Sequence, residues 1–293
     1  MIGCAMRVGL LCLALIGFAA EANAAEPAPP ILRGSEPASS EPPFLRGAEV
    51  YVPGAPVSPR WSGWYGGVQF GYGVGHADFN NATQSSIANM ARGLAVESEF
   101  AISSLPQLGV ANTGNTVYGL FAGYNFQWDE VILGLEMNYN HTGLSAQASD
   151  VIARQGVLSN GTTAIFTLIS SASVNLTDYA TFRARAGYAS SGVFLPYGFV
   201  GAAVGLVDVT RSATLILHEI NLSRIPPLDV TTTPSASESK RMTIYGFSAG
   251  LGVDVMLRSN IFLRGEYEFT QFSTFSDITM NINTVRLAAG LRF

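Results

Sequence analysis

The chain ends in the sequence NTVRLAAGLRF, residues 283–293, and the strict alternation of this stretch decides the fold. Successive side chains of a β-strand point to opposite sides. One side here would carry the apolar residues Val285, Leu287, Ala289, Leu291 and Phe293. The other would carry Arg286, Ala288, Gly290 and Arg292. Similar strands recur upstream, always with the charged side in the minority, so we expect the apolar side to meet lipid.

The composition supports a membrane protein without spanning helices. Charged residues make up 13% of the 293 residues, against about 25% in soluble domains. Beyond the first two dozen residues the sequence has no run of about 18 apolar residues, the minimum for a transmembrane helix. A closed barrel is the other structure that satisfies every backbone polar group in hydrocarbon. The composition therefore predicts a transmembrane β-barrel.

The amino terminus has the pattern of a signal peptide. Arg7 supplies a positive charge, residues 8–20 are apolar, and Ala22, Asn23 and Ala24 form an A-x-A cleavage site. We expect residues 1–24 to be removed before Ala25. The mature chain is then an exported protein.

Export has consequences for cysteine chemistry and for partners. Cys4 and Cys12 both lie in the segment expected to be removed, so the mature chain would have no disulfide. The formal net charge is -5, and this mild acidity argues against nucleic acid as a partner.

Residues 25–60 are rich in Pro, Ser, Ala and Glu and are expected to form a disordered periplasmic tether. The tether contains a repeat, because PPILRGSE at residues 29–36 returns as PPFLRGAE at residues 42–49. The repeat is either a duplicated spacer or a short docking motif for a periplasmic partner or the cell wall.

Residues 61–293 are expected to form the barrel domain. Eight stretches alternate in polarity, and they cover residues 64–75, 116–126, 131–140, 176–188, 193–209, 245–257, 263–269 and 283–293. Short turns alternate with longer connections, which is typical of a bacterial outer-membrane barrel. The predicted fold is all-β, an eight-stranded antiparallel up-and-down transmembrane barrel. Three long external loops are predicted at residues 79–115, 143–173 and 211–240, the first with a short helix at residues 85–94.

Nine charged side chains fall on the inward side of these strands. They are Glu136, Arg183, Arg185, Asp254, Arg264, Glu266, Glu268, Arg286 and Arg292. An eight-stranded barrel is just wide enough for its side chains to fill, so charges inside it need partners. Two hypotheses follow: a structural plug of ion pairs, or a narrow gated pathway for small polar solutes.

Several stretches carry a family resemblance. The start WSGWYGG at residues 61–67, the middle at residues 119–125, the segment Pro196-Tyr197-Gly198 and the ending at residues 285–293 resemble the small porin-like outer-membrane surface antigens of alphaproteobacteria. These are similar in architecture to OmpA and opacity-type barrels. The resemblance covers residues 61–293 apart from the long loops. It implies a location in the outer membrane, with outer-membrane lipid as a partner.

The same resemblance implies two roles for the ends of the mature chain. The last strand would be an assembly signal for the barrel insertion machinery, carried by Val285, Leu287, Ala289, Gly290, Leu291 and Phe293. Related barrels can also be attached to peptidoglycan through an amino-terminal alanine followed by an acidic residue. Ala25 and Glu26 match that pattern.

We expect no catalytic, cofactor or metal site. His76, His141 and His218 all fall at outer strand ends or in predicted loops, where histidines are usually solvated. Barrel hydrolases need a serine or an aspartate paired with a histidine at the outer rim. A serine–histidine pair would arise here by chance, because every loop is rich in serine. The predicted function is that of a structural surface barrel that supports envelope integrity. The alternative is a porin for nonspecific diffusion of small solutes.

Overall fold

The computed structural model describes residues 60–106, 108–190 and 192–293. These residues belong to one compact unit, Gly54–Phe293. The predicted signal segment, the repeat in the tether, and the residues Ala25 and Glu26 lie outside the described residues. Within the described part of the chain, no helix is both long and apolar enough to cross a membrane.

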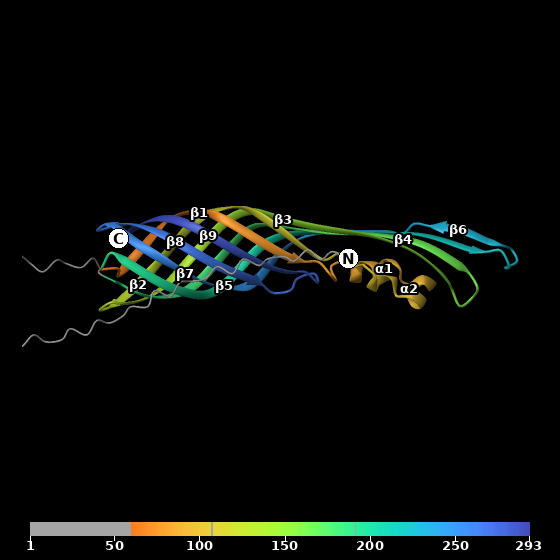
Figure 1. Ribbon diagram of the computed structural model, residues 1–293, viewed down its shortest axis with the longest axis horizontal. Coiled ribbons are helices and arrows are strands. Elements are labelled where there is room, and N and C mark those ends of the chain that lie inside the picture. The colour runs from red at the N-terminus through yellow and green to blue at the C-terminus, as the bar shows by residue number, and fades with distance from the viewer. Residues whose placement is uncertain (1–59, 107, 191) are drawn as a thin grey trace, which may run out of the picture. The chain divides into compact units, whose positions relative to one another are not determined.

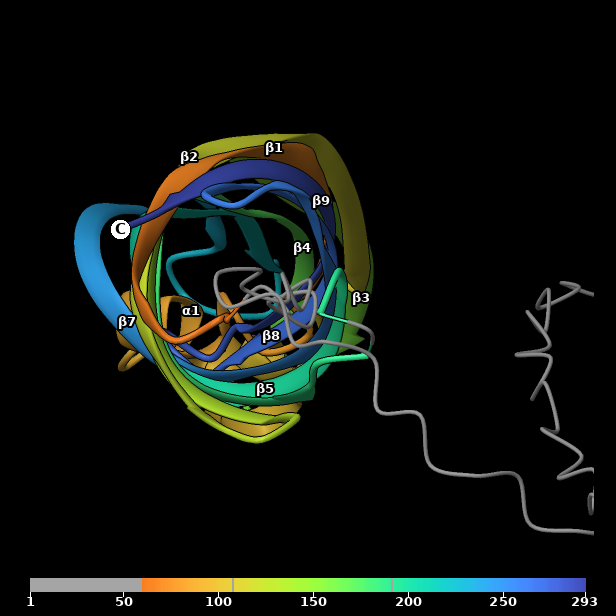
Figure 2. The same ribbon diagram turned by 90° about the vertical axis from the view of Figure 1, so that its left-hand side faces the viewer.

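Eight antiparallel strands form a closed ring (Figure 1), which Figure 2 shows end-on. The strands are β1 (Gly63–Asp78), β2 (Val110–Trp128), β3 (Val131–Val157), β4 (Thr163–Tyr188), β5 (Phe194–Asn221), β7 (Ser235–Arg258), β8 (Ile261–Phe272) and β9 (Thr279–Arg292). Each pairs with its neighbour along the chain, and the pairing of β1 with β9 closes the ring. A short strand, β6 (Leu228–Thr232), pairs with β5 outside the ring. The predicted eight-stranded barrel is confirmed.

The two ends of the ring differ. Short turns join β2 to β3, β4 to β5 and β7 to β8, and the start of β1 and the end of β9 lie at this same end. We call it the short-turn end, and the opposite end the long-hairpin end. Between the two ends, the outward side chains are apolar, as the 61% exposed Phe70 and the 72% exposed Leu287 illustrate.

At the long-hairpin end, four strands continue beyond the ring as a sheet that we call the extension. The pairing of β3 with β4 runs on to Val157 and Thr163. The pairing of β5 with β7 runs on to Thr214 and Ser235. The prediction of loops at residues 143–173 and 211–240 is therefore wrong, because most of these residues are in paired strands.

An inversion of polarity along the strands explains this error. Within the ring, β3 directs the apolar Met137 outward and the polar Glu136 inward. In the extension, the same strand buries Leu144 on the inner side and exposes Ser145 on the outer side. The direction of the side chains is unchanged, but the apolar side is now the inner one. A prediction based on outward apolar residues therefore places the end of the strand too early, at residue 140 instead of Val157.

A β-bulge in β4 accompanies this inversion. Leu176 pairs with Val207 and Asp178 pairs with Leu206, which leaves Thr177 as an extra residue. A bulge of one residue changes which residues of a strand face inward. It allows β4 to keep Arg183 inward in the ring and Leu176 inward in the extension.

The first predicted loop is a compact helical segment. It contains α1 (Gln84–Met90), α2 (Ala95–Phe100) and the 3-10 helix η1 (Ile102–Ser104). The two α-helices lie beside the extension in Figure 1. The helix predicted at residues 85–94 corresponds to α1. The segment buries apolar side chains of the three helices, Ile87, Val96 and Ile102, in one cluster with strand residues such as Phe166 and Leu215. The segment thus covers the inner side of the extension.

Two further apolar clusters fill the ring at different levels. The first, at the short-turn end, includes Trp61, Phe121, Ile132, Leu195 and Phe262. The second, toward the long-hairpin end, includes Val117, Leu144, Leu176, Phe272 and Ile282. The inward charged residues lie between these two apolar layers along the strands.

Candidate functional site: the charged interior of the barrel

The structure brings together eight of the nine predicted inward charges. Alternation along the strands directs them into the ring, and each is at most 5% exposed. They are Glu136 on β3, Arg183 and Arg185 on β4, Asp254 on β7, Arg264, Glu266 and Glu268 on β8, and Arg286 on β9. Arg292 is not part of this cluster. It lies at the short-turn end, where its guanidinium donates to the carbonyl of Ser259 (2.8 Å).

Asp254 anchors one half of the cluster. It lies directly opposite Arg264 on the neighbouring strand. Arg264 donates to Asp254 through Nε (2.8 Å to Oδ1) and Nη2 (3.1 Å to Oδ2). Arg185, two strands away on β4, donates to the same carboxylate (2.7 Å). This fork geometry is the strong, charge-assisted kind of hydrogen bond.

Glu136 is the most connected residue of the cluster. Its Oε2 accepts hydrogen bonds from Arg264 Nη1 (2.7 Å), Arg185 Nη1 (3.2 Å) and the hydroxyl of Tyr65 (2.7 Å). Its Oε1 accepts a hydrogen bond from Asn138 Nδ2 (2.7 Å). Oε1 also lies 3.3 Å from Arg183 Nη2. One carboxylate thus pairs with three guanidinium groups.

Arg183 links this half of the cluster to a second group of charges. Its Nη1 donates to Glu266 Oε1 (2.8 Å), which also accepts a hydrogen bond from Arg286 Nη2 (2.5 Å). Arg286 donates to Glu268 as well. The hydroxyl of Tyr197 donates to the other oxygen of Glu266 (2.8 Å). All eight charges therefore belong to one connected network.

The network is electrically balanced. It contains four arginines and four carboxylates, and each has an ion pair with an opposite charge. Aromatic rings lie over the guanidinium groups of Arg185 and Arg264: Arg185 lies 3.8 Å from the centre of the Tyr197 ring and Arg264 lies 4.4 Å from that of Phe121. Such cation–π contacts stabilise desolvated cations. The arrangement can hold charge in the barrel without exposing it to lipid or water.

Sequence reasoning missed several polar and aromatic members of this interior. Tyr65 and Tyr197 lie on the inward side of their strands, so the alternation could have identified them as partners for the charges. Trp61 precedes β1, where no alternation applies. It is 2% exposed, donates from Nε1 to the carbonyl of Gly192 (3.1 Å) and packs edge-on against Phe262. It closes the short-turn end of the ring.

The residues of the predicted assembly signal divide between the two sides of β9. Val285, Leu287, Ala289, Leu291 and Phe293 face outward, and Phe293 is 83% exposed. Gly290 faces inward. A Cβ atom there would lie 2.3 Å from the ring of Phe262, so packing alone requires glycine at this position.

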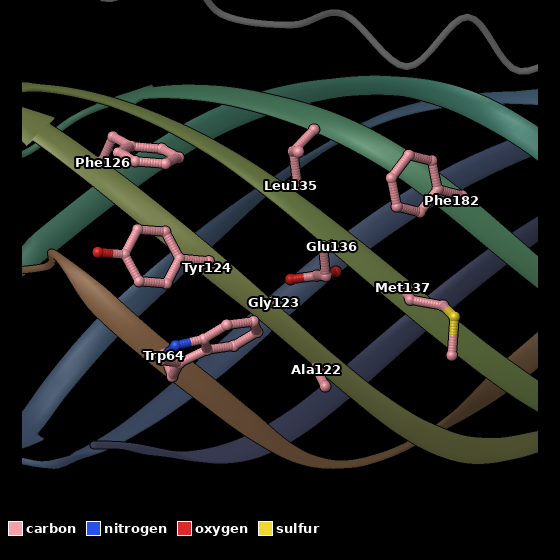
Figure 3. A pocket seen from close by; sticks show the side chains of 9 residues that line it. All are labelled: Trp64, Ala122, Gly123, Tyr124, Phe126, Leu135, Glu136, Met137 and Phe182. Atoms are coloured by element: carbon pink, nitrogen blue, oxygen red, sulfur yellow. The ribbon is translucent and has the colours of Figure 1, made fainter.

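The outer wall of the ring is apolar and uneven. A groove of about 590 Å³ crosses it, with Trp64, Tyr124 and Phe126 on one side and Met137 and Phe182 on the other (Figure 3). Glu136, next to Met137 on β3, is directed to the interior. The charged chemistry of this part of the barrel is therefore internal.

The three histidines do not converge. His76 lies 2.6 Å from Asn112, His141 lies 2.8 Å from Asp178, and His218 lies 2.7 Å from Asp229. Within the described residues, no group of three or more His, Cys, Asp or Glu side chains could hold a metal ion.

The sequence of the chain is similar to those of known outer-membrane proteins. The chain is 27% identical over 250 residues to a 31 kDa outer-membrane immunogenic protein of Brucella melitensis. This alignment covers 82% of the chain and 87% of that protein. It is 24% identical over 239 residues to a 25 kDa outer-membrane immunogenic protein of Brucella ovis, with 81% of each covered. A 22 kDa outer membrane protein of Rhizobium leguminosarum is 25% identical over 183 residues, which are 59% of this chain and 64% of that protein.

Solved structures of other proteins align over most of the chain, with low TM-scores. The Ail protein of Yersinia pestis is 15% identical with a TM-score of 0.31, covering 79% of this chain and 99% of that one. Neisserial surface protein A is 13% identical with a TM-score of 0.34, covering 79% and 98%.

The model of the outer membrane protein beta-barrel domain family matches residues 52–293. With the closed ring of eight strands and its apolar outer wall, this match locates the protein in the outer membrane, embedded in lipid. The chain belongs to the outer membrane protein beta-barrel domain family.

Proposed function

We propose that this protein is a filled, non-conducting barrel with a structural role in the outer membrane, where it supports envelope integrity and presents the extension at the cell surface. The observation that supports the proposal is the layered interior. A balanced network of eight charges lies between two apolar clusters that include Trp61 and Phe262 on one side and Phe272 and Ile282 on the other.

A porin needs a continuous polar path, and this interior argues against one. Water-filled channels occur in barrels of about 16 strands and more, whereas an eight-stranded barrel is just wide enough for its side chains to fill or to hold one small ligand. A solute would have to displace Trp61 at one end and separate ion pairs such as Arg264 with Asp254 in the middle. Uncompensated charges in such an interior are costly. The network therefore favours a plug over a pathway.

Single-channel recording tests this proposal against the porin hypothesis. The full chain is refolded, checked for the folded band by electrophoresis without heating, and inserted into planar bilayers beside a large porin as a positive control. We expect no steady openings from the folded protein. Repeated openings with the same single-channel conductance, and a conductance that increases with salt concentration, would establish the porin function instead.

We also propose that the mature amino terminus attaches the barrel to peptidoglycan. The support is the match of Ala25 and Glu26 to the pattern of related barrels. The test is co-sedimentation of the full chain with purified peptidoglycan. Loss of binding in Glu26→Ala would support attachment at this residue, whereas loss only after deletion of residues 27–58 would assign binding to the repeat. Unchanged binding in both variants would contradict a specific attachment.

A further inference from the structure

The extension has two edges, and one of them is open. Within the ring, β3 pairs with β2 on one side and β4 on the other, but its pairing with β2 ends at Thr142. From Leu144 onward, β3 has a ladder with β4 alone among the described residues. We call residues 144–153 the β3 edge. It is about 33 Å long at the usual rise of a strand.

The opposite edge of the same sheet is protected. β7 pairs with β5 from Ser235 onward, and its pairing with β8 starts at Gly246. The part of β7 that has no partner strand on the side away from β5 carries Glu238, Lys240 and Arg241 in close succession. In addition, α1 lies against β5 and β7. Charged side chains and a covering helix are the devices by which proteins prevent unwanted strand pairing.

The β3 edge has few of these devices. It contains no proline and a single charged residue, Asp150. Its outer side carries Ser145, Gln147, Ser149, Val151 and Ala153, which are neutral and mostly small. A long edge with few charges is a template for another strand. The two edges of one sheet therefore differ in how they would receive a second chain.

An exposed apolar patch lies beside the β3 edge on the outer side of the extension. Val151 is 63% exposed and pairs with Ile169, which is 42% exposed. Ile165 and Ile216 on the adjoining strands are 40% and 39% exposed. Outward polar side chains such as Gln147 and Ser173 separate this patch from the apolar wall of the ring, so we expect this face to be in water. A strand added next to β3 would place alternate side chains beside Val151.

We propose that the β3 edge binds an extended, uncharged segment of another polypeptide, which adds to the extension as a further strand. Main-chain hydrogen bonds supply affinity in this mode of recognition, and the side chains at alternate positions supply specificity. The segment is expected to carry apolar residues at alternate positions, facing the patch around Val151 and Ile169.

A second copy of the same chain in the same membrane does not fit. Antiparallel pairing between the β3 edges of two copies would require one copy to be inverted, because both β3 strands run outward from the short-turn end. A shared membrane does not allow this inversion. Parallel pairing in register would place Asp150 of the two copies side by side, where like charges repel. The geometry thus favours a different polypeptide.

The test uses the full chain refolded in phospholipid vesicles and a fluorescent synthetic peptide with the sequence of residues 165–175. This segment of β4 pairs with β3 on its other side, so it serves as a model strand. Binding is measured by fluorescence anisotropy, and the bound region is located by hydrogen exchange. A peptide with Ser170→Pro, which cannot continue a ladder, is the negative probe.

Two paired variants separate the edges. Val151→Lys with Ala153→Lys adds charge to the β3 edge. Ser235→Lys with Ser237→Lys adds the same charge to the β7 edge, where Ser235 lies in the same row across the sheet as Val151. We expect saturable binding to the unmodified chain, about tenfold weaker binding to the β3 variant, and a change of less than about twofold in the β7 variant.

Protection of residues 144–153 from exchange would locate the peptide at the proposed edge. No binding to the unmodified chain, equal binding of the proline peptide, or protection at another segment would overturn the proposal. Vesicles with the unmodified chain could also aggregate in the absence of peptide. If the β3 variant abolishes this aggregation, copies in facing membranes pair with each other, and the choice of a different polypeptide is overturned. These outcomes are independent of whether the barrel conducts.

Discussion

Replacing Glu136 by Gln should destabilise the folded barrel more than any single change at its surface. Glutamine has the shape of glutamate, so the change leaves the packing of β3 almost intact. It removes the charge that Arg183, Arg185 and Arg264 share, at contacts of 3.3, 3.2 and 2.7 Å. The side-chain amide would also direct hydrogen-bond donors at neighbouring donors.

The expected loss follows from the charge balance of the network. In the unmodified protein four arginines face four carboxylates. After the change, four cations would face three anions, and one buried charge would be uncompensated. Removing one partner of a buried ion pair costs about 3–5 kcal/mol. This is a large share of the roughly 5–15 kcal/mol by which proteins are stable.

The measurement is the free energy of unfolding in urea, with the barrel folded reversibly in phospholipid vesicles and followed by tryptophan fluorescence. Adding Arg264→Met to Glu136→Gln restores the balance, with three charges of each sign. The double variant should therefore lose less than the sum of the two single variants, with a coupling of about 1 kcal/mol or more. Asp208→Asn, at an exposed ion pair with Arg241, is the surface control.

A loss below about 1 kcal/mol for Glu136→Gln, no larger than that of the surface control, would refute the reasoning. So would additivity in the double variant. Either result would mean that the interior is hydrated well enough to solvate an unpaired arginine, which would also weaken the proposal of a filled barrel.

Three further predictions follow from individual contacts. Gly119→Ala should lower the free energy of unfolding by about 1–3 kcal/mol, because its Cβ would lie 1.9 Å from the carbonyl oxygen of Tyr139, whereas Gly265→Ala, whose Cβ would lie 4.0 Å from Leu287, should have little effect on the urea midpoint. Deletion of Phe293, 83% exposed at the end of the chain, should reduce the amount of barrel inserted in cells far more than the urea stability of barrel already folded; normal surface levels of the truncated protein would contradict the assembly-signal role. Hydrogen bonds from Arg241 lower the pKa of the Asp208 carboxyl, so any stabilisation by this pair is complete at neutral pH and is lost as the pH falls from the ordinary value of about 3.9 through the lowered pKa. The urea midpoints of the unmodified chain and of Asp208→Asn should therefore converge in acid. A difference between the two midpoints that grows below about pH 4 would contradict this assignment.

The ring could be predicted from the sequence because lipid imposes one rule on every strand. Outward residues such as Phe70, Met137 and Leu287 are apolar, and residues between them are small or polar. This contrast has period two and needs no knowledge of neighbouring strands. It was sufficient to obtain eight strands, their sides and the inward position of Glu136, Arg183 and Asp254.

The extension could not be obtained in the same way, since its outer side faces water. Ser145 and Gln147 are outward there, whereas Leu144 is inward, and the bulge at Thr177 shifts the alternation in β4. The rule that identifies strands in lipid then points to the wrong side. The two edges of the extension, and their different protection, became visible only with the pairing of the strands.

The partners within the network also depended on the tertiary structure. Alternation directs Arg292 inward as it does Arg286, but Arg292 is at the end of β9 and reaches the turn carbonyl of Ser259 instead. Glu136 contacts arginines from β4 and β8, which meet only when the ring closes. The sequence by itself determined which side of each strand meets lipid, because that depends on the residue and its immediate environment. The three-dimensional closure of the sheet decided which charge pairs with which, because a pair requires two strands that are distant in sequence to come within about 4 Å.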